Sequence, residues 1–166
     1  MIRRSFATVI ICALIFPVTL LAKPAVPVWR DAHPWSTEMA TVVVDGIEIE
    51  AEIADTSPLQ TRGLGYRDGL EPGTGMIFLF DSQSPRSFWM KGMRFCLDII
   101  WIQDGEIVGA AENACPEPGV PDADLTRYRS GVPVETVLEV PAGWMAEHDV
   151  GAGANVTIIL PGDPAG

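Results

Sequence analysis

The chain has 166 residues, of which 48% are hydrophobic and 20% are charged, a composition typical of one globular domain and not of a disordered chain. Twenty-two acidic residues and eleven basic residues give a formal net charge of −11 at pH 7. A surface this acidic repels phosphate backbones and anionic lipid headgroups, so nucleic acid is excluded as an expected partner.

The amino terminus has the layout of a secretory signal peptide. Two arginines precede an uncharged apolar run over residues 6–21, and Ala22 supplies the small residue of a cleavage site. We therefore expect a signal peptide at residues 1–22 and an exported protein, periplasmic or extracellular, with no stable membrane insertion after cleavage. An uncleaved anchor is the alternative, although the run is short for a span of roughly 20 residues and contains Pro17.

The rest of the chain divides into three parts. Residues 23–38 are rich in proline and lack periodicity, which predicts a linker or extended arm. A single β domain is expected over residues 39–160. Residues 161–166, with two prolines and two glycines, are expected to form a disordered tail that cannot continue a strand or a helix.

A β-hairpin is predicted at the start of the domain. Residues 39–44 are β-branched or apolar, and Asp45-Gly46 is a strong signal for a two-residue turn. Residues 47–53 then alternate apolar side chains with glutamates. This period of two predicts a core-facing apolar row and an exposed row formed by Glu48, Glu50 and Glu52.

A short helix follows the hairpin, with Ser57 as its N-cap, Pro58 in its first position and Gln60 completing a capping box. A second short helix is expected to begin after Pro141 and to end near His148. Further apolar strands are expected at residues 76–80, 87–90, 97–102, 106–111, 134–140 and 155–160. About eight short strands with two short helices predict a mainly β fold, a compact sandwich or barrel, and not alternating βαβ units.

Two cysteines, Cys96 and Cys115, flank a predicted hairpin whose turn is Asp104-Gly105. In an exported protein two such cysteines tend to pair. The hairpin register places Cys96 opposite Asn113, two residues short of Cys115, so a bulge near Asn113-Ala114 would align the two sulfurs. We predict a structural disulfide that contributes about 3 kcal/mol.

Asp98 is an isolated acid in an apolar strand. A buried carboxylate is costly without a partner, so we expect it to meet a cation. The candidate partners are Arg62, Arg67, Arg86, Lys91 and Arg94. Either Asp98 forms a structural ion pair, or it is a functional carboxylate in a pocket.

Other site chemistry is sparse in this sequence. His33 and His148 lie far apart without clustered ligands, so no metal site is expected, and no cofactor or nucleophile motif occurs. Strand alternation puts Trp89 on the opposite side from Phe88, so one of the two could contribute to an aromatic ligand face.

Several motifs together resemble a known family. They are Ala54-Asp55-Thr56, Arg62-Gly63-Leu64, Arg67, Phe78-x-Phe80, Ser87-Phe88-Trp89-Met90-Lys91, Leu97-Asp98-Ile99, Glu112-Asn113-Ala114, Val137-Leu138-Glu139-Val140, Ala142-Gly143 and Gly151. Over about residues 40–160 the chain resembles the family called domain of unknown function 192. The resemblance implies an exported or membrane-attached single domain with a compact, mainly β fold. It implies no catalytic residues, because no biochemical role has been assigned to the family.

The resemblance carries over motif positions only. These are Arg62, Gly63, Arg67, Phe88, Met90, Lys91, Asp98 and Asn113. Gly92-Met93 stands where the family usually has Asn-Thr, so a ligand bound by that turn should be bound differently or more weakly here.

Three functions remain open. The first is a monomeric, non-enzymatic module that binds a small molecule or an envelope glycan. Its candidate site residues are Arg62, Arg67, Trp89, Lys91, Arg94, Asp98 and Asn113. The second is a hydrolase or lyase that uses Asp98 as acid or base, which requires Asp98 to be accessible in a concave pocket. The third is a structural or partner-binding domain with a flat, exposed aromatic patch.

Overall fold

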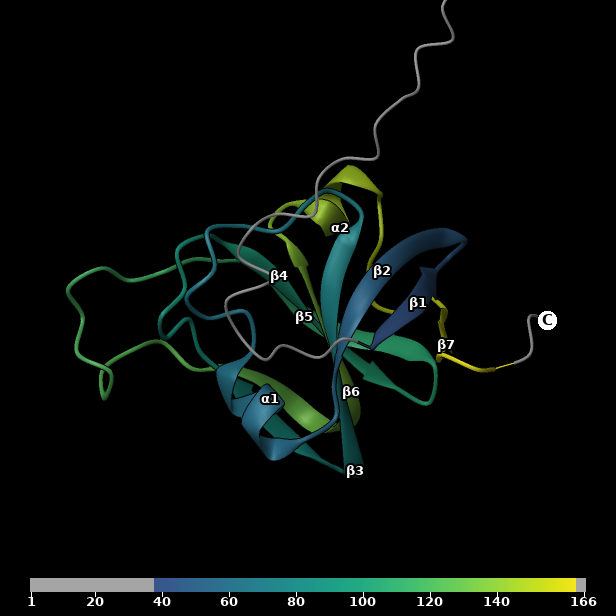
Figure 1. Ribbon diagram of the computed structural model, residues 1–166, viewed down its shortest axis with the longest axis horizontal. Helices are drawn as coiled ribbons and strands as arrows, with labels where there is room; N and C mark the ends of the chain where they lie inside the picture. The colour runs from purple at the N-terminus through teal and green to yellow at the C-terminus, as the bar shows by residue number, and fades with distance from the viewer. Residues whose placement is uncertain (1–37, 164–166) are drawn as a thin grey trace, which may run out of the picture.

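The structure is a computed structural model that describes residues 38–163 and has a mainly β fold with two short helices (Figure 1). Its elements are β1 (Met39–Val44), β2 (Ile47–Ala54), α1 (Ser57–Arg62), β3 (Thr74–Phe88), β4 (Leu97–Gln103), β5 (Glu106–Ala114), β6 (Tyr128–Pro141), α2 (Trp144–Glu147) and β7 (Val156–Ile159). The predicted signal peptide and nearly all of the predicted arm lie outside the described residues. The prediction of a mainly β domain with two short helices is confirmed.

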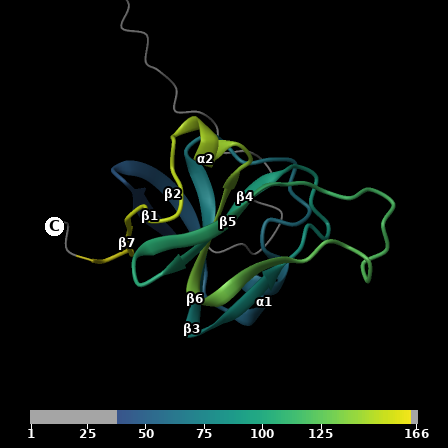
Figure 2. The same cartoon turned by 180° about the vertical axis from the view of Figure 1, so that it is seen from behind.

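One seven-stranded sheet, in the order β5-β4-β6-β3-β2-β1-β7, forms the body of the molecule. The sheet curls until its two edges meet at one end, where Ile107 N donates to Ala154 O and Val156 N donates to Gly105 O. The result is a half-barrel, visible in Figures 1 and 2. All neighbouring strands are antiparallel except β2 and β3, which are parallel and connected through α1.

Both faces of the sheet are buried, so the domain has two hydrophobic cores. The strand period of two sends Ile99 and Trp101 to one face and Ile100 and Ile102 to the other. The α2 core takes its name from α2, which contributes Trp144 and lies at the opposite end of the sheet from α1 in Figure 1. The α1 core packs beneath α1 and the loops around it.

The predicted first hairpin is present, with Val44 paired to Ile47 across the Asp45-Gly46 turn. Glu48 and Glu50 are exposed as predicted, but the prediction for Glu52 is wrong, since only 5% of its surface is accessible. The segment that follows α1 folds over this end of β2 and covers Glu52. A period-two pattern within one strand cannot anticipate such cover from another part of the chain.

Three elements differ in detail from the sequence prediction. The strands expected at 76–80 and 87–90 form one continuous strand, β3, whose register against β6 shifts between Leu79 and Ser84 and again between Pro85 and Ser87. β6 therefore begins earlier than expected, because it pairs with the far half of β3. The domain accordingly has seven strands where the sequence suggested about eight.

The capping box predicted for α1 does not form. Thr56 occupies the N-cap position without a side-chain cap hydrogen bond. The Gln60 side chain instead donates from Nε2 to Ala54 O at 3.3 Å and to Leu79 O at 2.8 Å. Gln60 therefore fixes α1 to the parallel strands β2 and β3. Its side chain makes tertiary contacts and does not cap its own helix.

The predicted disulfide is confirmed, with the Cα atoms of Cys96 and Cys115 4.1 Å apart. Leu97 pairs with Ala114 and Ile99 with Ala111, so β5 has one extra residue in this interval. A second extra residue lies where Ile102 pairs with Ile107 but Trp101 pairs with Gly109. The predicted bulge near Asn113 is therefore present, but both irregularities together supply the two-residue shift that aligns the cysteines.

Candidate functional site

Asp98 is a structural carboxylate inside the α2 core. It has no accessible surface, and it accepts three backbone N–H bonds: from Asn113 at 2.8 Å, Gly143 at 3.2 Å and Met145 at 3.0 Å. Gly143 is the N-cap residue of α2 and has no side chain, so Asp98 performs the capping from β4. The expected cation partner is therefore wrong, because N–H groups stabilise this buried acid instead.

Asn113 contributes its backbone to this arrangement. Its φ of 52° lies in the left-handed region, which asparagine tolerates better than most residues, and the bulge turns its N–H toward Asp98. Asn113 and Asp98 thus lie together, and they hold the β4–β5 hairpin and α2 in place.

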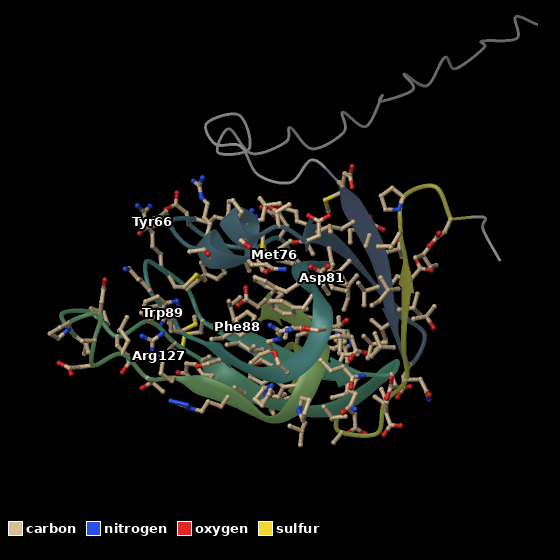
Figure 3. All side chains as sticks on the ribbon, turned by 90° about the horizontal axis from the view of Figure 1, so that it is seen from below. Tyr66, Met76, Asp81, Phe88, Trp89 and Arg127 are labelled. Atoms are coloured by element: carbon tan, nitrogen blue, oxygen red, sulfur yellow. A yellow bond between two sulfur atoms is a disulfide. The ribbon has the colours of Figure 1, made fainter. Side chains whose placement is uncertain are left out.

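A cleft of about 710 Å³ lies beside α1 on the other face of the sheet. We call it the α1 cleft, and the lining residues used below are Arg62, Phe78, Phe88, Trp89, Lys91 and Glu139. Its walls come from α1 and the residues that follow it, from the end of β3 and the turn after it, and from β6. In Figure 3, Tyr66 lies toward α1, and Trp89 and Arg127 lie on the opposite side.

Trp89 is surrounded by cations. The Arg127 guanidinium carbon lies 3.6 Å from the Trp89 ring centroid, and Lys91 Nζ lies 5.1 Å from it. A second cavity of about 510 Å³ shares Phe88 and Trp89 with the α1 cleft and adds Arg86 and Arg127 to its lining. Four basic side chains therefore lie around two adjoining cavities.

Lys91 forms an exposed ion pair with Asp122, with Nζ 2.6 Å from the carboxylate oxygen. The hydrogen bond and the negative charge of Asp122 raise the pKa of Lys91, so this side chain stays positively charged at neutral pH. Exposed pairs of this kind contribute little free energy and exchange readily with other partners.

Glu139 is a buried acid in the wall of the α1 cleft, with 6% of its surface accessible. Burial raises the pKa of Glu139 from 4.5 to about 8, while the positive charge of Arg67 acts in the opposite direction. At neutral pH Glu139 is therefore protonated in most of the protein molecules. The neutral acid can both donate and accept a hydrogen bond.

The sheet register places Glu139 beside a second buried acid. Met76 on β3 pairs with Glu52 on one side and with Glu139 on the other, so the two acids flank it on one sheet face. Arg67 donates two hydrogen bonds to Glu52, at 2.6 Å and 2.7 Å, from a side chain that is 1% exposed. One arginine thus lies near two buried carboxyl groups: it donates two hydrogen bonds to Glu52, and its positive charge also acts on Glu139.

The candidate residues from the sequence fall into separate groups. Arg62, Trp89 and Lys91 are brought together at the α1 cleft. Arg67 is buried against Glu52. Arg94 pairs with Asp68 at 2.5 Å on the surface, and Asp98 and Asn113 lie with α2.

Sequence reasoning missed Glu139 and Tyr66. Glu139 is, like Asp98, an acid inside an apolar strand, and it belongs to the motif Val137-Leu138-Glu139-Val140. The pattern that drew attention to Asp98 could therefore have identified Glu139 as well. Tyr66 packs against the turn at Gly92, where an added Cβ would lie 2.9 Å from the ring. Gly92, with φ of 70° and no Cβ, thus leaves room for the Tyr66 ring against the turn.

Two further observations concern the described residues only. No group of three histidine, cysteine or acidic side chains within residues 38–163 could hold a metal ion. Neither helix in that range has the length and apolar character needed to cross a bilayer.

Comparison with known proteins agrees with the fold. Residues 40–158 match the family described as DUF192, Uncharacterized ACR. A solved protein from Sinorhizobium meliloti 1021, named as a candidate transcription regulator, has 28% identity and a TM-score of 0.65, covering 75% of this chain and 95% of its own. A protein of unknown function from Novosphingobium aromaticivorans DSM 12444 has 32% identity and a TM-score of 0.63, covering 72% and 83%. Curated proteins gave no match.

Proposed function

The chain belongs to the DUF192 family, and we propose that it is an exported, non-enzymatic module that binds a small ligand in the α1 cleft. The observation that carries the proposal is the cleft itself. Its volume of about 710 Å³ is in the range of small-molecule sites, and it combines aromatic walls with a few polar groups.

The aromatic side chains of the cleft are placed for ligand contact. Phe88 and Trp89 are only partly buried, and both line the cleft. Phe88 packs edge-on against Phe78 of the α1 core, with ring centroids 4.9 Å apart, and so presents part of its ring to the cleft. A small metabolite or a segment of an envelope glycan could stack on such rings while it exchanges hydrogen bonds with Lys91, Arg62 or Glu139.

The rival function, a hydrolase or lyase acting through Asp98, is not supported. A catalytic acid or base must come within hydrogen-bond reach of its substrate. Asp98 is fully buried and is occupied by three backbone N–H groups. A substrate could reach it only if α2 left the sheet.

The name of the Sinorhizobium protein raises regulation through DNA as a possible role for relatives of this chain. The net charge of −11 opposes DNA contact here. The basic side chains around Trp89 line cavities and do not form an extended stripe. DNA binding is therefore not part of the proposal.

Export rests on the amino-terminal sequence and on the disulfide, a bond that persists in oxidising compartments. Intact-mass measurement on protein recovered from the cell envelope or medium should give a chain that begins at Lys23 with Cys96 and Cys115 oxidised. Recovery of the whole chain from the cytosol with both thiols free would contradict export.

Ligand binding is tested by thermal-shift measurement of the purified protein with cell-wall sugars and small metabolites. A ligand present at about 100 times its Kd adds about 2.7 kcal/mol of stability and so raises Tm by several degrees. Trp89→Ala should abolish that shift. Val108→Ala, on β5 and outside both cavities, should leave it unchanged. The proposal fails if no compound shifts the wild type, or if Trp89→Ala responds as the wild type does.

A further inference from the structure

Positive charge is unevenly distributed in this acidic domain. The described range, residues 38–163, contains seven basic residues, and four of them line the α1 cleft or the adjoining cavity: Arg62, Arg86, Lys91 and Arg127. A fifth, Arg67, is buried nearby against Glu52. Surfaces that concentrate one sign of charge attract ligands of the opposite sign.

The interior of the cleft has a different character from its mouth. Phe78 lies on the buried side with 1% of its surface accessible, and Phe88 and Met93 extend the apolar lining. Lys91 at the mouth keeps 39% of its side-chain surface exposed, so a ligand can reach its charge from solvent. The cleft thus offers apolar contact within and positive charge outside.

We propose that the α1 cleft binds a small amphipathic anion, a carboxylate or phosphate on an apolar body, and that the Glu139 side chain in its wall takes part in this binding. This inference rests on the proposed function, because it names the ligand class for the same site. The anionic group lies among Arg62, Lys91 and Arg127, and the apolar body lies against Phe78 and Phe88.

The part that Glu139 takes in binding follows from the charges near it. Arg67, after α1, is the charged group that acts on Glu139, and Glu52 on β2 lies across Met76 from it. The other charged and titratable groups that line the same cleft are Arg62 on α1, Tyr66 after α1, and Lys91 in the turn after β3. The neighbours on β3 and β4 are apolar. Arg67 already pairs with Glu52, so an ionised Glu139 would place a second carboxylate beside one arginine and add negative charge to the cleft wall, where it would repel an anion.

The experiment is calorimetric titration of the purified protein with three probes that share one apolar chain: octanoate, octyl phosphate and neutral octyl glucoside. We expect an anion to bind at least about tenfold more tightly than the glucoside at low ionic strength. The comparison between octanoate and octyl phosphate decides which anionic group the site prefers.

Charge variants test the mouth of the cleft. Lys91→Ala and Arg127→Ala should each weaken anion binding severalfold and leave glucoside binding unaltered. Asp122→Asn should strengthen anion binding, because it frees Lys91 from its ion pair. Arg94→Ala removes a similarly exposed cation that is paired with Asp68 outside the cavities, and it should behave as the wild type.

The same titrations, repeated at different pH values, test the role of Glu139. Affinity for octanoate should fall about tenfold between about pH 7 and about pH 9 in the wild type, but little in Glu139→Gln. The inference would be overturned if all three probes bound with equal affinity and Lys91→Ala left those affinities unchanged. It would also be overturned if Glu139→Gln showed the same pH dependence as the wild type. Either outcome would leave small-ligand binding in the α1 cleft intact. Absence of binding by these probes and by the sugars and metabolites would overturn both proposals.

Discussion

Two isolated acids in neighbouring strands show that the role of a buried acid depends on which face of the sheet its side chain lies on. Asp98 on β4 pairs with Val140, one position from Glu139, but the two side chains lie on opposite faces of the sheet. Asp98 faces α2 and receives three N–H groups, so its buried charge is stabilised. Glu139 faces the α1 cleft, where burial favours the neutral acid even though the charge of Arg67 acts in the opposite direction.

Glu139 should make the stability of the protein depend on pH. Below about pH 4.5 the side chain is protonated in both the folded and the unfolded chain. Between that value and about pH 8 the unfolded chain loses the proton while the folded protein keeps it, so the free energy of unfolding falls as pH rises. Each unit of pKa difference corresponds to about 1.4 kcal/mol.

Glu139→Gln removes this titration while it preserves the shape of the side chain. We expect the variant to gain at least about 2 kcal/mol over the wild type as pH is raised from about 5 to about 8. Urea denaturation at several pH values measures the difference. Parallel pH profiles for the two proteins would show that Glu139 has an ordinary pKa. Glu106→Gln, an exposed substitution on β5, is the matched control.

At the scale of single residues, the sequence was sufficient where the determining partners are close along the chain. Cys96 and Cys115 could be paired because a two-residue turn brings their strands together within two residues of alignment, and β-bulges supply the remaining shift. The partners of Asp98 include Gly143 and Met145, which are 45 and 47 residues away, and nothing local in the sequence identifies them. Glu139 was overlooked for the same reason, since its depth depends on α1 and on Arg67.

At the scale of elements, the same distinction separates the accurate predictions from the inaccurate ones. The hairpin at Asp45-Gly46 and the hairpin at Asp104-Gly105 were predictable because turn chemistry is local. The continuous length of β3 was not, because its far half is a strand only by pairing with β6. α1 has six residues, too few for stability in isolation, and Gln60 fixes its place by hydrogen bonds to β2 and β3.

The elements that build the cleft are those with the fewest local determinants. α1 depends on contacts from Gln60, and the turn after β3 depends on the close approach of Tyr66 to Gly92. The Tyr66 N–H donates to Gly92 O at 2.8 Å, which ties the segment after α1 to the opposite wall. The site could therefore be located from the sequence only through Arg62, Trp89 and Lys91, without its buried acid.

At the scale of the whole molecule, the curled sheet joins two cores through shared strands. β3, β4 and β6 each send alternate side chains into the α1 core and the α2 core. Neither core can therefore lose its packing while the strands that support the other stay in place. The two cores should unfold in one cooperative transition, as small single domains usually do.

Neighbouring residues on β4 test this cooperativity. Ile99 lies in the α1 core and Ile100 in the α2 core, and both have 0% accessible surface. Ile99→Val and Ile100→Val each remove one buried methylene, which should cost about 0.5–1.5 kcal/mol. Because the strands are shared, either substitution should lower one common denaturation midpoint, whether followed by far-UV circular dichroism or by tryptophan fluorescence. Midpoints that separate in one variant would show instead that the α1 side, with its cleft, can unfold independently of the α2 core.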